Sequence, residues 1–449
     1  MPAPDAVRPA PVSRRALRWD LVAVGSAAVL VVVAALVGRA LLAAGIDIFL
    51  DFPPLLASWQ PHIGPGTPIA IVTAAAVVLH GPALAQRLSW GRMLAAGWAA
   101  AVVWTLSLAL VDGWHDGVVG RLTSNQEYLH DVPRVTDIAE MLRTFSDHIL
   151  TDRPGFWTTH VGAHPPGVFL LFVWLDRIGL GGGGAAGIVV ILVGASACAA
   201  VAVALRALGA EDVARSVLPF GVLLPGAVWV GVSADGMFAG VLAWGVALLA
   251  VGATAAGRRA DLAALAGGLL LGYTLYLSYG LALGGLLPLV VLGVTRRRRA
   301  AVFAVAGAAT VGAAFTAGGF WWLTGYRDVT VIYAASIAAT RPYWYFVWAD
   351  LAAVLFAMGP AMVAGLRRMA AAPRALPVAV ALLAAAALAA ILAADVSGFS
   401  KGEVERIWLP FVVWLTLPCA LLPRAQVRAW LAAQALLALA VNHLLFTVW

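Results

Sequence analysis

Apolar runs of about 20 residues recur along most of this chain, and they constrain its fold more than any other feature. A helix of about 20 apolar residues is long enough to cross a hydrocarbon core of about 30 Å. The runs are continuous and rich in Ala, Leu, Val and Gly, whereas the strands of a membrane barrel alternate over about ten residues. Because 62% of the residues are hydrophobic and only 11% are charged, we predict an all-α, polytopic membrane protein.

Thirteen runs qualify as candidate spans. They cover approximately residues 21–45, 67–86, 93–112, 184–206, 214–232, 236–256, 261–279, 281–295, 300–322, 346–366, 376–395, 408–423 and 427–448. We expect a tail at residues 1–20 and a single transmembrane domain over residues 21–449. The two cysteines, Cys198 and Cys419, both lie inside apolar runs and indicate neither a disulfide framework nor a zinc site.

Charge is distributed unevenly between the two ends of these spans. If the N-terminus lies inside the cell, the inner segments hold 19 of the 29 basic residues and five of the 22 acidic ones. Basic residues concentrate on the cytoplasmic side of membrane proteins. We therefore predict a cytoplasmic tail and outward-facing loops at residues 46–66, 113–183, 323–345 and 396–407. The net charge of +7 then reflects topology and contact with membrane lipids, and no nucleic-acid partner is expected.

The loop at residues 113–183 is the one long polar insert, and it gathers candidate acid and base groups: Glu127, Asp131, Asp137, Glu140, His160 and His164. Residues 135–145 alternate at helical spacing between apolar and charged side chains, which predicts a short amphipathic helix on the outer surface. Residues 168–178 are apolar but too few to span a membrane. They follow Pro165-Pro166 and are expected to form an interfacial helix that begins at the prolines.

Two further outer segments carry charges that a bilayer makes costly. Asp235 lies in the very tight turn between two spans, and Glu405-Arg406 precedes Trp408-Leu409-Pro410. Each group also has a simpler interpretation. Asp235 could cap the following helix, Glu405 and Arg406 could form a solvated ion pair, and His164 could be an ordinary loop histidine beside a proline turn.

The order of these motifs resembles the GT-C membrane glycosyltransferases, in particular the aminoarabinose-transferase and protein O-mannosyltransferase branch. A loop carboxylate, His164-Pro165-Pro166, Asp235 and Arg406-Ile407-Trp408-Leu409-Pro410 follow one another as in that branch. The resemblance covers approximately residues 101–255 and 398–418. It implies a GT-C-like fold and a sugar transferase that works at the outer membrane face.

The resemblance implies that Asp131 or Glu127 is the catalytic carboxylate, and that His164, Asp235 and Arg406 bind the substrate. The sequence departs from the pattern by an additional N-terminal hairpin of two spans and by the lack of an adjacent acidic pair. Asp47 and Asp51, in the loop after the first span, are therefore alternative catalytic carboxylates.

The expected chemistry is transfer of a sugar from a polyprenyl-phosphate carrier to an acceptor hydroxyl, with a carboxylate as general base. Arg406, Arg341 and His164 are candidates to neutralise the leaving phosphate, and Glu405 and His160 complete the substrate-binding set. The aromatic residues within 326–345 could form a lid over the sugar or an interfacial belt. A metal is not favoured, because the sequence has no HExxH or comparable ligand set, and no other cofactor is expected.

Arginine supplies 28 of the 29 basic residues, which with the Ala, Gly and Val bias suggests a GC-rich bacterial genome. By resemblance, we expect mannose or arabinose as the sugar, a cell-envelope glycan or glycolipid as the acceptor, and the bacterial inner membrane as the location. A lipid-linked-saccharide flippase or solute transporter is the alternative. It would place ionisable groups or broken helices near the bilayer midplane and often has two related halves. A non-catalytic assembly partner is a third reading.

Overall fold

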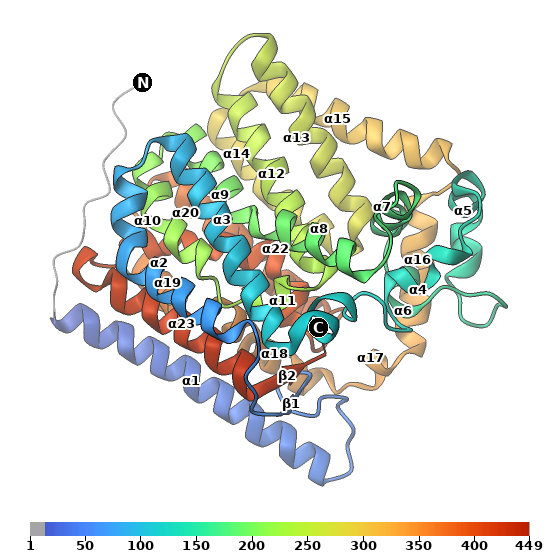
Figure 1. Cartoon of the computed structure of the whole chain (residues 1–449). Coiled ribbons are helices and arrows are strands. Elements are labelled where there is room, and N and C mark those ends of the chain that lie inside the picture. Colours follow the sequence, from blue (N-terminus) through green and yellow to red (C-terminus); the bar gives the residue numbers. More distant parts are fainter. Residues whose placement is uncertain (1–13, 449) are drawn as a thin grey trace.

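Helices form most of residues 14–448, the part of the chain that the computed structural model describes (Figure 1). Within these residues, nine helices are long and apolar enough to cross a membrane. They are α1 (Arg14–Ala43), α2 (Thr67–Arg87), α3 with a 3-10 extension (Trp90–Asp112), α8 with α9 (Gly183–Ala207), α12 (Ala234–Thr254), α13 (Arg258–Leu277), α15 (Arg298–Ala317), α20 (Val378–Ser397) and α23 with a preceding 3-10 turn (Arg424–Leu444). The prediction of an all-α, polytopic membrane protein is confirmed.

The other four predicted spans are helical but interrupted, so the count of thirteen is not confirmed. The segment predicted at 346–366 is α18 (Tyr343–Met358) and α19 (Pro360–Ala371), which meet at an angle of 110°. The remaining three are α10 (Glu211–Val222) with α11 (Ala227–Val230), a 3-10 turn with α14 (Leu286–Thr295), and α22 (Leu409–Val412) with the 3-10 segment η6 (Val413–Leu421). Proline and glycine within or between the pieces account for most of these breaks.

A buried glutamine satisfies the backbone at the sharpest break. Gln434 of α23 is fully buried, its Oε1 accepts the N–H of Ala361 at 3.1 Å, and its Nε2 donates to the carbonyl of Met358 at 2.8 Å. These are backbone groups that the bend removes from the helical hydrogen-bond pattern. Inside a membrane such groups must find a partner within the protein, and Gln434 supplies it.

Helix α1 lies along the outside of the bundle and packs against α18 and α19 (Figure 1). It begins at Arg14, seven residues before the predicted start of the first span, and the rest of the predicted tail lies outside the described residues. Asp20 of α1 is fully buried, and it accepts hydrogen bonds from Arg367 and from both Nε and Nη2 of Arg368, the latter at 2.9 and 2.6 Å. This ion-pair cluster fastens α1 to α19.

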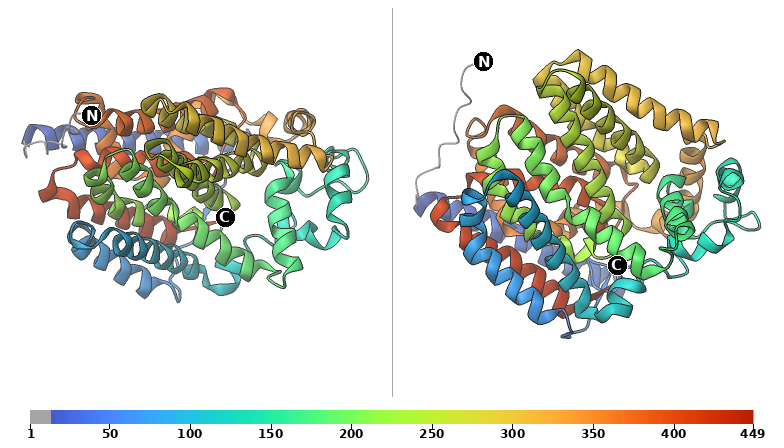
Figure 2. Two further views of the ribbon diagram at one scale, coloured as in Figure 1. Left: turned by 90° about the horizontal axis from the view of Figure 1, so that it is seen from above. Right: turned by 45° about the horizontal axis from the view of Figure 1, so that its top comes forward.

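Short helices gather at one end of the molecule, at the right of Figure 1 and of both views in Figure 2. They are α4 (Tyr128–Asp131), α5 (Ile138–Thr144), α6 (Thr159–Gly162), α7 (Pro166–Arg177) and α16 (Trp322–Ala335). Helix α5 is the predicted amphipathic helix, shortened because Asp137 caps it by accepting the N–H groups of Ala139 and Glu140. Helix α7 is the predicted interfacial helix and begins at the second proline, as expected.

One small feature was not predicted. Strand β1 (Ala57–Trp59) pairs antiparallel with β2 (Leu445–Thr447), so that Ser58 lies opposite Phe446. The pairing joins the loop after α1 to the end of α23. Three-residue strands lack the length that makes alternation readable in a sequence.

Candidate functional site

A buried arginine forms the centre of the candidate site. Arg406 lies in the short helix α21 (Val404–Ile407) and is 7% exposed. Its Nη1 donates to Oδ2 of Asp235 at 2.6 Å, and its Nη2 donates to Oε2 of Glu403 at 2.7 Å. Burial lowers the pKa of Arg406, but the carboxylates of Asp235, Glu403 and Glu127 raise it by more, so the guanidinium stays charged. The structure thus joins the two predicted residues Asp235 and Arg406, which are 171 positions apart.

The same contacts overturn two simpler interpretations. Asp235 lies in the first turn of α12, and the hydrogen bond that its side chain makes among the described residues is with Arg406. Glu405 and Arg406 do not form a solvated pair, because both are buried and Arg406 bonds Glu403 instead. Burial and the nearby charge of Glu403 raise the pKa of Glu405 to about 8. Its Oε2 also has no hydrogen-bond partner within residues 14–448, so the anion is poorly stabilised.

A carboxylate and a histidine from the long loop form a second pair. Nδ1 of His160 lies 2.6 Å from Oε1 of Glu127, and both side chains are largely buried. Glu127 precedes α4, and His160 lies in α6, where its backbone N–H donates to the carbonyl of Gln126 at 3.0 Å. Oε2 of Glu127 is buried and has no hydrogen-bond partner among the described residues. The Tyr128 ring lies 6.0 Å from that of His160 and 5.9 Å from that of His164, which in turn contacts α12, so this pair lies close to the arginine centre.

Asp131 has different surroundings from Glu127. Its Oδ1 accepts from Nη1 of Arg134 at 2.8 Å, and its Oδ2 accepts the backbone N–H of Thr158 at 2.7 Å. The side chain is 1% exposed. Both oxygens of Asp131 therefore hold the loop together, whereas Oε2 of Glu127, among the described residues, accepts no hydrogen bond.

His164 packs between the two pairs. Its Nδ1 lies 2.8 Å from the carbonyl oxygen of His160, to which it donates, and 3.2 Å from the Tyr128 hydroxyl. Its ring also lies 6.1 Å from that of Phe238 on α12. Burial lowers the pKa of His164 to about 4, against a smaller opposing effect of Asp235. An uncharged His164 at neutral pH can bond a substrate but does not supply the positive charge that its predicted phosphate role requires.

Arg341 joins the loop after α1 to the loop before α21 at the edge of the site. Its Nε donates to the carbonyl of Ile48 at 3.2 Å, its Nη2 donates to that of Phe49 at 3.1 Å, and its Nη1 donates to that of Lys401. Nη2 also lies 3.7 Å from Oε1 of Glu403. The predicted phosphate contact would therefore add to a structural role.

The alternative carboxylates Asp47 and Asp51 are both exposed. They lie in the loop that Arg341 anchors, and Asp47 accepts the backbone N–H of Phe49 at 2.7 Å. The structure brings this loop to the edge of the site, but it shows no contact between either aspartate and Arg406.

The aromatic stretch within 326–345 packs against backbone carbonyls. The hydroxyl of Tyr333 donates to Gly398 at 2.6 Å, that of Tyr343 to Val396 at 2.9 Å, and that of Tyr345 to Ala34 at 2.9 Å. Tyr345 is fully buried. These contacts favour an anchored structural layer over a lid that closes on a sugar.

A hollow opens beside the arginine centre. It measures about 320 Å³ including its open mouth, and its lining includes Asp235, Phe238, Ser278, Ser400 and Trp408. The indole N–H of Trp408 is buried and has no hydrogen-bond partner within residues 14–448. Aromatic rings beside hydroxyl and carboxylate groups are suited to a polar ring-shaped ligand.

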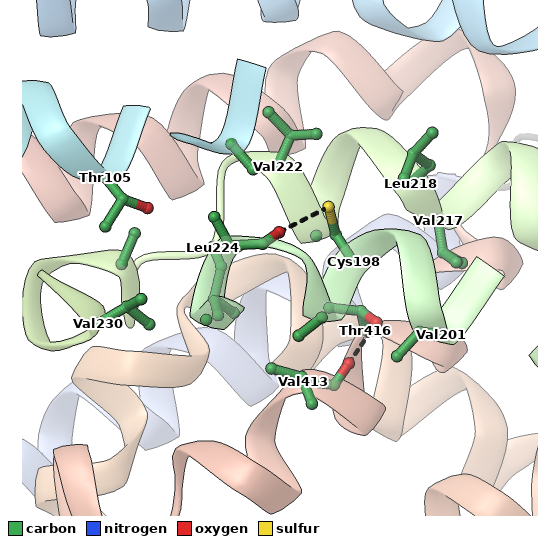
Figure 3. A pocket seen from close by; sticks show the side chains of 16 residues that line it. Thr105, Cys198, Val201, Val217, Leu218, Val222, Leu224, Val230, Val413 and Thr416 are labelled. Atoms are coloured by element: carbon green, nitrogen blue, oxygen red, sulfur yellow. Dashed lines mark hydrogen bonds between the residues drawn. The ribbon is translucent and has the colours of Figure 1, made fainter. Parts of the chain in front are cut away.

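A larger hollow, of about 520 Å³, lies within the helical bundle and has an almost wholly apolar lining (Figure 3). Two of its polar side chains are satisfied locally. Cys198 donates to the carbonyl of Ala195 at 3.2 Å, and Thr416 donates to that of Val413 at 2.7 Å. This hollow offers no acid, base or charge for chemistry, unlike the one beside Asp235.

Among residues 14–448, no group of three or more His, Cys, Asp or Glu side chains is arranged to hold a metal ion. His160 and His164, the one histidine pair at metal-ligand spacing in the long loop, point their Nδ1 atoms at Glu127 and at the His160 carbonyl.

Sequence reasoning missed two site residues, Glu403 and Tyr128. Glu403 lies three positions before Arg406, the spacing at which helical side chains meet. Tyr128 directly follows Glu127, and its pKa is raised by burial and by the nearby carboxylates.

Comparison with known proteins shows a similarity in structure. No protein family model and no curated protein match the sequence. The chain is similar to the crystal structure of ArnT from Cupriavidus metallidurans in the apo state, with a TM-score of 0.45 and 18% sequence identity. The match covers 73% of this chain and 59% of that one, so the chain spans less than two thirds of ArnT. Similarity at this level establishes neither a family nor an activity for the protein.

Proposed function

We propose that this protein is a GT-C-type glycosyltransferase that moves a sugar from a polyprenyl-phosphate carrier to an acceptor hydroxyl. The observation that carries the proposal is the pairing of Glu127 with His160 next to the buried Arg406–Asp235 pair. A transfer of this kind needs a base for the acceptor proton and a cation for the departing phosphate. The two pairs offer both within one buried cluster.

Glu127 is the proposed general base. Its Oε1 is held by His160 at 2.6 Å, while Oε2 is left to accept the proton of the acceptor hydroxyl. His160 orients the carboxylate and stabilises its charge until the acceptor oxygen attacks the anomeric carbon. A positioned base contributes about 10²- to 10⁴-fold in rate.

Arg406 is the proposed phosphate ligand, because a guanidinium matches phosphate geometry and gains strength where water is excluded. The sugar would lie in the hollow that Asp235, Phe238 and Trp408 line. This hollow borders Asp235, the partner of Arg406, so phosphate and sugar would occupy adjoining places. His164, close to Phe238, would bond the sugar or the acceptor as a neutral imidazole.

The finer assignments rest on the motif series in the sequence. We propose mannose or arabinose as the sugar, a cell-envelope glycan or glycolipid as the acceptor, and the outer face of a bacterial inner membrane as the place of reaction. The concentration of arginines at the opposite ends of the spans supports this orientation.

The second candidate is a lipid-linked-saccharide flippase or solute transporter. The 110° break between α18 and α19 and the buried carboxylates Asp350 and Asp395 in candidate spans favour it. However, Gln434 pairs the backbone at that break without any charge. The base and cation at the end of the bundle would have no role in simple transport.

Sugar transfer by purified protein in liposomes tests the proposal. Synthetic polyprenyl-phospho-mannose and polyprenyl-phospho-arabinose, each labelled in the sugar, serve as donors, with a cell-envelope glycolipid extract as acceptor. We expect wild-type protein to transfer label and Glu127→Gln to lower the rate by about 10²-fold or more. Glu140→Gln, an exposed carboxylate in the same loop, is the matched control and should transfer as wild type.

Two results would count against the proposal. Full transfer by Glu127→Gln would remove Glu127 as the base. No transfer from either donor, together with movement of the labelled lipid between leaflets, would favour the flippase.

A further inference from the structure

Glu403 bridges two arginines in the way an anionic ligand would. Its Oε2 lies 2.7 Å from Nη2 of Arg406, and its Oε1 lies 3.7 Å from Nη2 of Arg341. Guanidinium groups that converge on one anion are a recurrent means of binding phosphate. Burial raises the pKa of Glu403, but Arg406 and Arg341 lower it by more, so the bridge is ionised at neutral pH.

The other carboxylate on Arg406 is held differently. Asp235 lies in the first turn of α12, a 21-residue helix buried along most of its length. Its side chain is 7% exposed, whereas that of Glu403 is 17% exposed. Asp235 is therefore fixed to the bundle, and Glu403 is the partner with a route to solvent.

The backbone at Glu403 is unusual for a residue with a side chain. Its φ is +62°, in the left-handed region that favours glycine. A non-glycine residue there costs about 1 kcal/mol or more, and such residues concentrate at functional sites. The preceding Gly402, with φ +83°, donates its N–H to Asp350 at 3.0 Å, and Arg341 holds the carbonyl of Lys401. Because the loop is anchored just before Glu403, the side chain can move without the loop.

We infer that the Glu403 carboxylate occupies the place of the donor phosphate between Arg406 and Arg341, and that it swings toward solvent when a polyprenyl phosphate binds. This inference rests on the proposed function. Without a ligand, Glu403 keeps two buried guanidinium groups neutralised. On binding, the phosphate takes the place of the Glu403 carboxylate as the anion between the arginines, so the site never holds unpaired buried arginines.

A purely structural ion pair makes the opposite prediction. If Glu403 only positions Arg406, its removal should weaken phosphate binding. If Glu403 competes with the phosphate, its removal should strengthen that binding. The sign of the change in Kd therefore separates the two roles.

The test measures binding of polyprenyl phosphate without sugar to purified full-length protein in detergent. We expect Glu403→Gln to bind about three- to tenfold more tightly than wild type. Asp235→Asn is the matched control, because it also removes one carboxylate charge beside the Arg406 guanidinium. The Asp235 side chain, however, is fixed to the bundle. Asp235→Asn should weaken binding or leave it within twofold. Thermal unfolding in the same detergent verifies that each variant is folded.

Weaker or unchanged binding of polyprenyl phosphate by Glu403→Gln would overturn the inference. Equal tightening by Glu403→Gln and Asp235→Asn would also overturn it, because it would indicate a general effect of charge. If Glu403→Gln does not fold, Glu403→Asp keeps the charge but is too short to reach both arginines, and it should also tighten binding. Sugar transfer by wild type tests the proposed function separately. If wild type transfers sugar but Glu403→Gln does not bind polyprenyl phosphate more tightly, only the displacement of Glu403 is refuted. If no variant binds polyprenyl phosphate, both the displacement and the proposed function are refuted.

Discussion

Asp131 accepts the backbone N–H of Thr158 at 2.7 Å and thereby ties α4 to the start of α6. Its second oxygen accepts from Arg134 at 2.8 Å. In Asp131→Asn only one oxygen remains to accept, so one of these two partly buried hydrogen bonds is lost. We expect this variant to lose about 1–3 kcal/mol of stability while the folded protein keeps transfer activity within about threefold.

Unfolding and sugar transfer measured on the same preparation check this prediction. Glu127→Gln provides the comparison, because it should show the reverse pattern of lost transfer with a smaller loss of stability. An Asp131→Asn protein that is stable and inactive would make Asp131 the base and would return Glu127 to a structural role.

Removal of Arg406 should be among the most destabilising single changes in the loops around the site. Arg406→Gln leaves the buried Asp235 without its cation and Glu403 with only Arg341 at 3.7 Å, which costs about 3–5 kcal/mol. The double variant Arg406→Gln/Asp235→Asn should recover part of this loss, because one uncompensated charge is gone.

The control for Arg406 is another arginine–carboxylate pair in the same chain. Arg299 contacts Asp261 at 2.7 Å, but its side chain is 74% exposed. Arg299→Gln should cost no more than about 1 kcal/mol. Equal losses at the two arginines, or no recovery in the double variant, would contradict the assignment of a buried ion-pair centre.

Glu405 should make stability depend on pH. Its pKa is raised by burial from 4.5 to about 8 in the folded protein. Between these values the folded state holds a proton that the unfolded state has lost, so stability falls as pH rises. Glu405→Gln removes this dependence. We expect its thermal midpoint to match that of wild type near pH 4.5 and to exceed it near pH 8.5.

The measurement is thermal unfolding across pH 4.5–8.5 in one detergent, with Glu140→Gln as an exposed control that should follow wild type throughout. A Glu405→Gln protein that is less stable than wild type at pH 8.5 would show that the ionised carboxylate has a favourable partner.

The sequence was sufficient to predict features that depend on neighbouring residues. Apolar length predicted the long helices, and Pro165-Pro166 predicted where α7 begins. The sequence analysis did not distinguish bent and interrupted segments such as α18–α19 from straight spans. Hydropathy measures the length and composition of an apolar run and does not report the direction of the helix axis. The polar group that makes that bend tolerable, Gln434, lies far along the chain.

The candidate site was predicted in part for a similar reason. Asp235 and Arg406 were chosen from short motifs, and their contact confirms that these motifs meet in space. Glu405, which adjoins Arg406 in sequence, was predicted to bind the substrate, and Glu403 was not. Adjacent residues on a helix point in different directions, whereas residues three apart share a face. That geometry explains why Glu403 pairs with Arg406 and Glu405 does not.

The last prediction concerns orientation, on which the proposed reaction depends. If the arginine-rich ends of the spans face the cytoplasm, the loop that contains Glu127 faces outward. Asp152 is exposed in that loop, and Ala256 is exposed between α12 and α13 at the opposite ends of the spans. Both native cysteines are buried, so a cysteine introduced at either position can be labelled with little background.

We expect Asp152→Cys to react with a membrane-impermeant maleimide in intact spheroplasts and Ala256→Cys to react only after permeabilisation. Retained sugar transfer in both variants would verify that the labelled proteins are native. The reverse labelling pattern would place Glu127 and Arg406 on the cytoplasmic side. A donor presented at the outer leaflet could not reach them there, so the proposed transfer at the outer face would be excluded.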